Sequence, residues 1–347
     1  MNRREFAKLA SGLPLILQEE EANMPSGNLS DIDGIKVGHY ESSQRPTGCT
    51  VILTPGGAVA GVDVRGSAPG TRETDLLNPI NSVDKVHAIL LSGGSAFGLS
   101  AAEGVVRYLE EKKIGYRTSS ALVPIVPAAI LYDLSLGDPS IRPNAEAGYQ
   151  ACKNAQTGPV REGNAGAGAG ATVGKLFGMT RAMKGGLGTC SIQAGQLKVA
   201  ALVAVNCIGD VVDSRSGKIL AGARDEAGTA LVDTMKWLTE NKMQIQPRIG
   251  ENTTLGVVAT NARFSKAAMT KVAQMAHDGL ARSINPVHLP MDGDTIFALS
   301  TGTLEDEAHL TQVGSLAAWT IEKAVKRAVL KATSLPGLPA ARDLSAP

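Results

Sequence analysis

Residues 250–261 read GENTTLGVVATN, a polar turn that runs directly into an apolar segment. Small and β-branched residues follow from residue 255 onward, and this composition predicts a buried strand over residues 255–260. Thr253 therefore stands at the head of the predicted strand. A threonine in that position is ordinary by itself, so its meaning depends on the rest of the chain.

Residues 288–297 read HLPMDGDTIF and show the same order of a turn before a strand. Asp292 and Asp294 flank a single glycine, just ahead of a strand predicted over residues 295–300. Aspartate and glycine are common in turns, so a purely structural interpretation is available. Two neighbouring carboxylates can equally hold a cation such as an amine.

Strand-like and helix-like segments alternate along the rest of the chain. Apolar runs and helical periodicity predict strands over residues 50–54, 59–64, 86–91 and 197–206, and helices over residues 96–113, 146–155, 225–241, 265–283 and 305–332. Buried strands flanked by helices are typical of a layered α/β fold. Since no linker interrupts the pattern, we expect a single domain over residues 31–333.

The composition excludes several classes of protein. The 347 residues carry a net charge of only +1 and 3% aromatic residues, which argues against a nucleic-acid binder. No apolar run approaches the length of a membrane span, so we expect no membrane partner. The four cysteines form no CxxC and the five histidines no HxH or HExxH, so the sequence predicts neither a disulfide framework nor a metal site. It also contains no cofactor motif.

The two ends differ from the rest of the chain. Arg3 and Arg4 precede a short apolar stretch, which resembles a twin-arginine export signal. Pro14 interrupts that stretch and no A-x-A cleavage site follows, so a charged N-terminal extension over residues 1–30 is the alternative. The protein is periplasmic or exported if the signal works and cytoplasmic otherwise. Residues 334–347 are rich in proline and predict a loose tail.

Two glycine-rich stretches suggest motifs that they do not complete. Residues 163–175 resemble a phosphate-binding loop, but Ala169 stands where the first glycine is required and Leu176 where Ser or Thr is required. A Rossmann fingerprint is also weak, because no strand precedes the glycines. Tight backbone packing, or a loop that presents Lys175 to a reacting carbonyl, remain as alternatives. Residues 92–98 approximate a nucleophile elbow, except that Phe97 replaces the second glycine.

Seven short motifs occur in order along the chain and carry a family resemblance. They are RGSAPGTRET (65–74), GGSAFG (93–98), VPIVPA (123–128), GAGAGATVGK (166–175), VN (205–206), NTT (252–254) and DGDT (292–295). Together they resemble the DmpA-like family of N-terminal-nucleophile hydrolases. That family includes L-aminopeptidase/D-esterases, β-peptidyl aminopeptidases and 6-aminohexanoate-oligomer (nylon-oligomer) hydrolases. The resemblance covers nearly the whole chain after residue 30.

The resemblance implies a four-layer αββα sandwich and a precursor that cleaves itself between Asn252 and Thr253. The products would be an α chain of residues 1–252 and a β chain of residues 253–347. Thr253 would then be an N-terminal residue whose Oγ is the nucleophile. Its α-amine, with an ordinary pKa of about 7.7–8.0, would serve as the general base.

The resemblance also assigns supporting roles. Asp294, backed by Asp292, would orient the new amine, and the Asn206 amide would donate to the oxyanion. Lys175 would add positive charge there, and Tyr132 would line the substrate pocket. Some members have Ser and Glu at the two carboxylate positions, so the double aspartate resembles the nylon-oligomer hydrolases without deciding the substrate.

Three functions fit these residues. The first is an amidase or peptidase acting on short peptides, β-peptides or linear amide oligomers such as those of 6-aminohexanoate. The second is acyl transfer of the ornithine-acetyltransferase type, which shares the processing chemistry. The third is an uncleaved family member without catalysis. For the first two, the resemblance implies a homo-oligomer of αβ units, often a tetramer.

Overall fold

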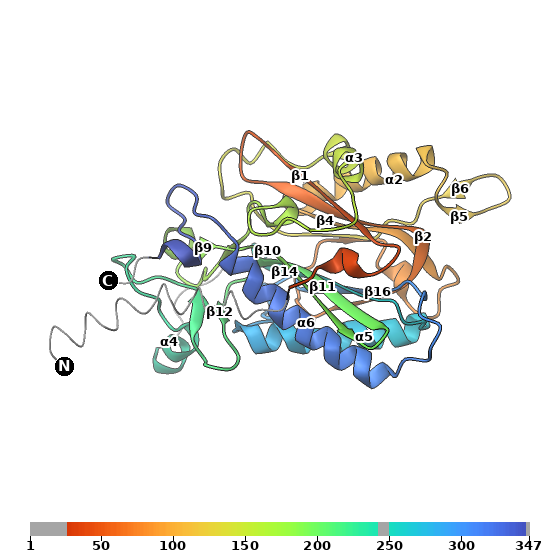
Figure 1. Ribbon diagram of the computed structural model, residues 1–347. Helices are drawn as coiled ribbons and strands as arrows, with labels where there is room; N and C mark the ends of the chain where they lie inside the picture. The colour runs from red at the N-terminus through yellow and green to blue at the C-terminus, as the bar shows by residue number, and fades with distance from the viewer. Residues whose placement is uncertain (1–25, 242–249, 345–347) are drawn as a thin grey trace.

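The computed structural model describes residues 26–241 and 250–344 of the chain. In Figure 1, helices α2 (Ala101–Glu111) and α3 (Ala145–Lys153) lie on one side of the strands. Helices α5 (Lys266–Ser283) and α6 (Leu310–Leu330) lie on the other side. A short helix, α4 (Thr234–Glu240), lies apart from these two pairs. None of the helices in the described part is long and apolar enough to cross a membrane.

The main sheet of the described residues has nine strands in the order β10-β11-β14-β16-β2-β4-β7-β3, with β1 paired to β2. Neighbours are antiparallel except for the parallel pairs β14–β16 and β4–β7. The strands are β1 Lys36–Glu41, β2 Gly48–Val64, β3 Thr71–Arg72, β4 Lys85–Ser92, β7 Ala128–Ile130, β10 Gly186–Ala194, β11 Leu197–Asn206, β14 Thr253–Thr260 and β16 Thr295–Ser300.

Short strands and single turns complete the described elements. The minor sheets contain β12 Asp210–Val212, β13 Ile219–Ala221 and β15 Ile284–Asn285; β5 Tyr116–Arg117 and β6 Leu122–Val123; and β8 Thr172–Val173 and β9 Met183–Lys184. The 3₁₀ turns are η1 Leu29–Asp31, η2 Asp75–Leu77, η3 Ser95–Ser100, η4 Gly166–Gly168, η5 Met179–Arg181 and η6 Ala341–Asp343.

Strand β2 belongs to both halves of the main sheet. Its first part pairs with β1 and β4, its last part pairs with β16, and its register with β4 shifts between Leu53 and Ala58. The sequence predicts two short strands here. That prediction is wrong, because Pro55 and the two glycines after it form an irregularity within one strand instead of a turn.

Three apolar cores separate four layers. Along β11, alternate side chains enter different cores: Val199, Ala201, Val203 and Val205 face α5 and α6, whereas Ala200, Leu202 and Ala204 face the other half of the sheet. On β4, Leu90 joins the third core beneath α2 and α3. The order helices, sheet, sheet, helices is the αββα sandwich that the resemblance implies, and the expected fold class is confirmed.

Two predicted helices are shorter in the structure. The segment predicted as a helix over residues 225–241 forms only α4, because Gly228 has a φ of +72° and Asp233 caps the helix by accepting the N–H of Lys236. The helix predicted over residues 96–113 begins as the 3₁₀ turn η3 and becomes α-helical at Ala101.

Both ends of the described chain pack on the domain. Leu29 is fully buried, so the fold begins two residues before the expected boundary. Leu338, Ala340 and Ala341 are buried, and the Lys184 N–H donates to the Pro339 carbonyl. The expectation of a loose tail is therefore wrong for residues 334–344. Arg3 and Arg4 lie outside the described residues.

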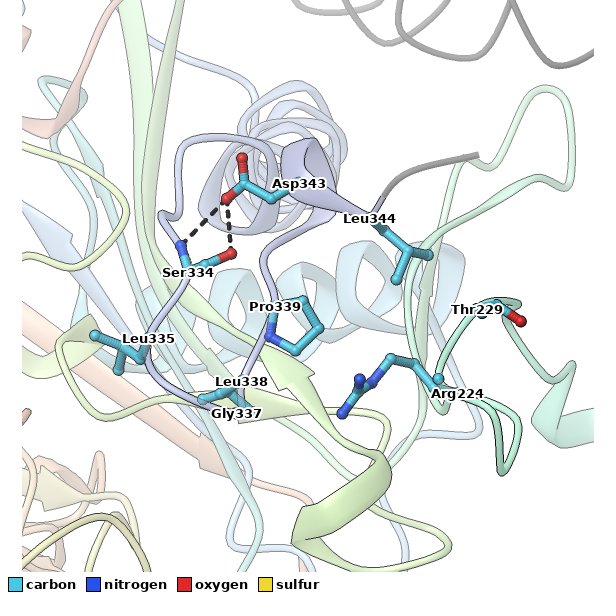
Figure 2. A pocket seen from close by; sticks show the side chains of 10 residues that line it. Arg224, Thr229, Ser334, Leu335, Gly337, Leu338, Pro339, Asp343 and Leu344 are labelled. Carbon is cyan, nitrogen blue, oxygen red and sulfur yellow. Dashed lines mark hydrogen bonds between the residues drawn. The ribbon is translucent and has the colours of Figure 1, made fainter. Parts of the chain in front are cut away.

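The C-terminal segment lines a pocket of about 430 Å³ together with Arg224 and Thr229. Figure 2 shows Asp343 accepting hydrogen bonds from the backbone N–H and the hydroxyl of Ser334, which closes the turn beside this pocket. None of the catalytic residues expected from the sequence lines it.

Candidate active site

The polar residues expected to be catalytic come together because three strands align at their ends. Thr253 opens β14, which lies between β11 and β16. On one side it pairs with Asn206, the last residue of β11. On the other side Asn252 pairs with Asp292, just before β16. The alignment buries the Asn252–Thr253 peptide, with both residues at most 3% exposed.

Two donors converge on the carbonyl oxygen of Asn252. The Thr253 hydroxyl lies 2.5 Å from this oxygen, and the Gly293 N–H donates to it from 2.9 Å. Gly293 is glycine for steric reasons, since a Cβ there would lie 2.8 Å from both Thr253 Oγ and the Ala68 carbonyl. The peptide bond before Thr253 therefore has its carbonyl polarised and a hydroxyl beside it.

The segment that begins at Arg65 supports the loop that holds the two aspartates. The Arg65 N–H donates to the Asp294 carbonyl, and the Ala68 N–H donates to the Asp292 carbonyl. Backbone pairing of this kind fixes a loop more firmly than side-chain contacts alone, because every bond involves a peptide group of limited freedom. The RGSAPGTRET motif thus has a structural role in placing the carboxylates.

The two carboxylates differ in their surroundings. Asp294 accepts from the Thr254 N–H at 2.7 Å through one oxygen, and from His288 through the other. The Asp292 carboxylate accepts the Leu289 N–H through Oδ2, and its Oδ1 is buried with no hydrogen-bond partner among the described residues. Burial, followed by the nearby charge of Asp294, raises the pKa of Asp292. The Asp292 carboxyl therefore takes up a proton more readily than an ordinary aspartate does.

Asn206 and Lys175 form a second polar group at the same end of the sheet. Asn206 Oδ1 accepts from the Thr172 N–H at 3.0 Å and from Lys175 Nζ at 3.1 Å, so its amide NH₂ faces the other way. That NH₂ donates to the carbonyls of Tyr132 at 3.1 Å and Glu251 at 3.5 Å. Lys175 Nζ also donates to the Glu251 carbonyl at 3.0 Å. Burial lowers the pKa of Lys175 to about 8.

The glycine-rich stretch 163–175 supports this second polar group. Lys184 is fully buried, and its ammonium donates to the carbonyls of Gly168, Ala171 and Gly185. Burial lowers its pKa to about 7. These three hydrogen bonds hold the loop in place. The C-terminal end of the loop places Thr172 and Lys175 within hydrogen-bond distance of Asn206.

Tyr132 lines a narrow pocket that Lys175, Met179 and Glu251 also line. The next residue, Asp133, forms a buried ion pair with Arg45 at 2.7 Å and accepts the Gly94 N–H at 2.9 Å. A Cβ at Gly93 would lie 2.1 Å from Asp133 Oδ2. The GGSAFG motif therefore anchors the segment that carries Tyr132.

The sequence analysis missed three participants in this geometry: the Gly293 N–H, the Glu251 carbonyl and His288. The first two are backbone groups, which leave no signal in residue type. His288 had a weak signal, since it lies six residues before Asp294 in a segment that contains the turn residues Pro290 and Gly293. In the described part of the chain, no group of three or more His, Cys, Asp or Glu side chains could hold a metal ion.

Comparison with known proteins decides the family. The model of peptidase family S58 matches residues 27–342. The chain belongs to this family. An uncharacterized aminopeptidase of Mycobacterium leprae is 44% identical, over 91% of this chain and 93% of the relative. A 6-aminohexanoate-oligomer endohydrolase of a Kocuria species is 34% identical, over 79% of this chain and 75% of the relative.

Solved structures of other proteins share the fold of this S58 peptidase. The L-aminopeptidase D-Ala-esterase/amidase of Ochrobactrum anthropi has a TM-score of 0.69 at 20% identity and covers 94% of this chain and 95% of its own. A β-aminopeptidase of a Burkholderia species has a TM-score of 0.64 at 22% identity, over 89% and 88% of the two chains. Family membership makes the protein a hydrolase of amide bonds, as the resemblance implies.

Proposed function

We propose that this S58 peptidase cleaves its own chain between Asn252 and Thr253 and then hydrolyses small amides with Thr253 as the nucleophile. The observation that carries the proposal is the Thr253 hydroxyl 2.5 Å from the Asn252 carbonyl oxygen, which the Gly293 N–H also binds. A hydroxyl held beside a polarised carbonyl in a buried site is arranged for acyl transfer.

The cleavage proceeds in two steps. Thr253 Oγ forms a bond to the carbonyl carbon of Asn252, the C–N bond breaks, and the proton that the hydroxyl loses passes to the amide nitrogen, which becomes the amine of Thr253. Water then hydrolyses the ester, which gives a carboxylate at Asn252 and restores the hydroxyl. The products are residues 1–252 and 253–347.

The exposed amine supplies the base for the second activity. Asp292 Oδ1, buried without a hydrogen-bond partner in the part of the chain that the structure describes, is an acceptor open to this amine, while both oxygens of Asp294 already accept hydrogen bonds. The two carboxylates thus have different roles: Asp294 fixes the backbone at Thr254, and Asp292 orients the amine toward Thr253 Oγ. The amine takes the proton of the hydroxyl as it attacks a substrate carbonyl and passes it to the leaving nitrogen.

The Glu251 carbonyl marks where a substrate oxygen would lie. In the uncut chain it accepts hydrogen bonds from both Lys175 Nζ and Asn206 Nδ2. Movement of the cleaved end would leave these two donors for the oxyanion of a substrate. A preorganised donor of this kind typically lowers the barrier by about 3 kcal/mol.

The pocket beside Tyr132 is narrow, which favours short or linear substrates over folded proteins. We therefore propose short peptides, β-peptides or linear amide oligomers as substrates, with water as the acyl acceptor. The 6-aminohexanoate-oligomer hydrolases among the relatives favour an amide oligomer as one member of this group. We further propose a homo-oligomer of αβ units, four in number, which light scattering can count.

Denaturing electrophoresis and N-terminal sequencing test the proposal. The purified protein should give two chains, and the smaller should begin Thr-Thr-Leu-Gly. The processed enzyme should then release amine from L-alanine amide, a β-alanyl dipeptide or a 6-aminohexanoate oligomer. Transfer of the acyl group to an added amine in preference to water would favour the acyltransferase alternative. A wild-type enzyme that is fully active as one uncut chain would overturn the mechanism.

A further inference from the structure

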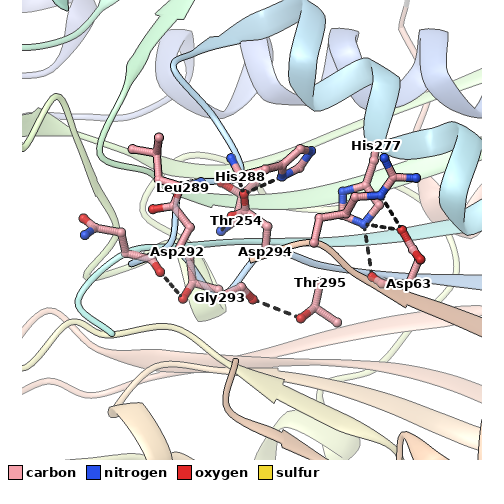
Figure 3. Close-up of polar contacts among 12 residues, drawn as sticks. Asp63, Thr254, His277, His288, Leu289, Asp292, Gly293, Asp294 and Thr295 are labelled. Atoms are coloured by element: carbon pink, nitrogen blue, oxygen red, sulfur yellow. Dashed lines mark hydrogen bonds and ion pairs between the residues drawn. The ribbon is translucent and has the colours of Figure 1, made fainter. Parts of the chain in front are cut away.

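His288 lies in the active site although neither the proposed reaction nor the sequence motifs include it. Its backbone has a φ of +57°, which only a few non-glycine residues adopt. In this conformation its Nδ1 lies 2.8 Å from Asp294 Oδ2, and its own N–H lies 3.3 Å from the same oxygen (Figure 3). The side chain is 18% exposed.

We propose that His288 is a positioning residue for the reaction, which holds the Asp294 carboxylate through its Nδ1–H. The proposal rests on the proposed function of Thr253. The hydrogen bonds of His288 within the described residues go to Asp294, which binds the Thr254 N–H, so His288 acts through Asp294 and the Thr254 backbone.

The hydrogen-bond partners decide which ring nitrogen carries the proton. Asp294 accepts the Thr254 N–H through Oδ1 and the His288 N–H through Oδ2, as an ionised carboxylate does. The ring must therefore donate from Nδ1. Nε2 is buried without a hydrogen-bond partner among the described residues, and a second proton there would have no acceptor. The arrangement therefore places a proton on Nδ1, where it faces Asp294.

The ring of His288 is itself held in place. His277 on α5 packs against it edge to face, with ring centroids 4.8 Å apart. His277 Nε2 lies 3.0 Å from the Asp63 carbonyl oxygen and 3.5 Å from its carboxylate, and Arg65 binds the same carboxylate at 2.7 Å. Burial lowers the pKa of His277 to about 4, which keeps this ring neutral near pH 7.

A fixed carboxylate matters because Asp294 controls the head of β14. Its Oδ1 binds the N–H of Thr254, so rotation of the carboxylate would release the backbone directly after the nucleophile. The Asp292 carboxylate instead accepts the Leu289 N–H. His288 thus contributes the hydrogen bond that prevents Asp294 from rotating toward Asp292.

The positive φ of His288 makes two variants informative. Glycine adopts this backbone without strain, so His288→Gly removes the ring and leaves a cavity. Asparagine also tolerates it and places an amide N–H at the position of Nδ1, so His288→Asn keeps the donor without the ring. We expect His288→Gly to lower kcat by about 10- to 100-fold with little change in KM, the range for losing a hydrogen bond to a charged group. His288→Asn should recover most of that loss.

Chemical rescue tests the donor itself. Added imidazole, which has an N–H, should restore kcat to His288→Gly, or its self-cleavage if that step is what fails. Neutral 1-methylimidazole has no N–H and should not restore it. In the Asp294→Asn background the His288→Gly change should add little, because both act through one carboxylate. Wild-type kcat in folded, processed His288→Gly, or equal rescue by both compounds, would overturn the proposal.

A parallel variant separates this inference from the proposed function. Thr253→Ala should be one uncut and inactive chain. If it is, a negative result for His288→Gly refutes the positioning role alone. If Thr253→Ala is fully active, the proposed function fails, and the positioning role fails with it.

Discussion

Gly293→Ala should abolish most self-cleavage while leaving the protein folded. The new Cβ would lie 2.8 Å from Thr253 Oγ and from the Ala68 carbonyl, where ordinary contact begins at 3.4 Å. A displacement of 0.6 Å is required on each side: the Thr253 hydroxyl can provide it by rotating away from Asn252, and the Ala68 carbonyl only by a small shift of its loop. The φ of Gly293 is not in the left-handed region, so alanine adds no backbone strain.

The magnitude follows from the two interactions that are disturbed. Thr253 Oγ loses its place beside the carbonyl, and the Gly293 N–H is pushed off the Asn252 oxygen, where it lies at 2.9 Å. Removing one oxyanion donor slows acyl transfer by about 10²–10³-fold, and misplacing the nucleophile adds to this. We therefore expect the half-time of cleavage to lengthen by at least about 10²-fold.

The assay is a time course of denaturing electrophoresis on freshly purified precursor, with thermal unfolding measured alongside. Gly56→Ala is the matched control, because a Cβ there meets nothing within 4 Å and no positive φ is involved. It should cleave at the wild-type rate. Folded Gly293→Ala that cleaves as fast as Gly56→Ala would refute the assigned role of the Asn252 carbonyl contacts.

Three further predictions concern the other polar residues. Thr253→Ser should still cleave itself, because serine keeps an oxygen nucleophile. Thr254→Ala should show at least partial self-cleavage by denaturing electrophoresis, because the hydroxyl that it removes lies one residue after the nucleophile. Asp294→Asn should lower kcat more than thermal stability, and wild-type kcat across pH 6–9 would contradict its role. Lys175 has a pKa lowered to about 8, so it loses its charge as pH rises through that value. The kcat of the wild type should therefore fall on the alkaline side, and Lys175→Met should have a low kcat without this alkaline fall.

The family motifs predicted which residues gather at the site, and the structure explains why the sequence could not predict the rest of the fold and the role of each residue. Periodicity predicted β11 and β16 at their observed bounds, because both are strands with apolar residues on two faces. It divided β2 in two, because Pro55 and the glycines that follow are equally typical of a turn and of a bulge. Which of these forms depends on pairing with distant β4, and local sequence does not encode that.

The sequence also could not predict the separate roles of the site residues, because these roles depend on contacts that local sequence does not encode. Asp292 and Asp294 are chemically identical in the sequence, and their hydrogen-bond donors distinguish them. The Leu289 N–H binds Asp292, whereas the Thr254 N–H and His288 bind Asp294. Lys184 is a charged residue in a short strand, and nothing local indicates that it is fully buried beneath the glycine-rich loop. Motifs identify which residues gather, whereas backbone geometry determines what each one does.

The order of the main sheet has a consequence for the life of the processed enzyme. Strands β14 and β16 follow the proposed cleavage point, yet they lie between β11 and β2, which precede it. The two fragments would be joined by two antiparallel strand pairs, β11 with β14 and β16 with β2. They could not separate without unfolding, and reassembly from separated fragments would be a bimolecular event. Cleavage would thus change a reversible folding equilibrium into kinetic trapping, in which the persistence of the enzyme depends on how slowly it unfolds.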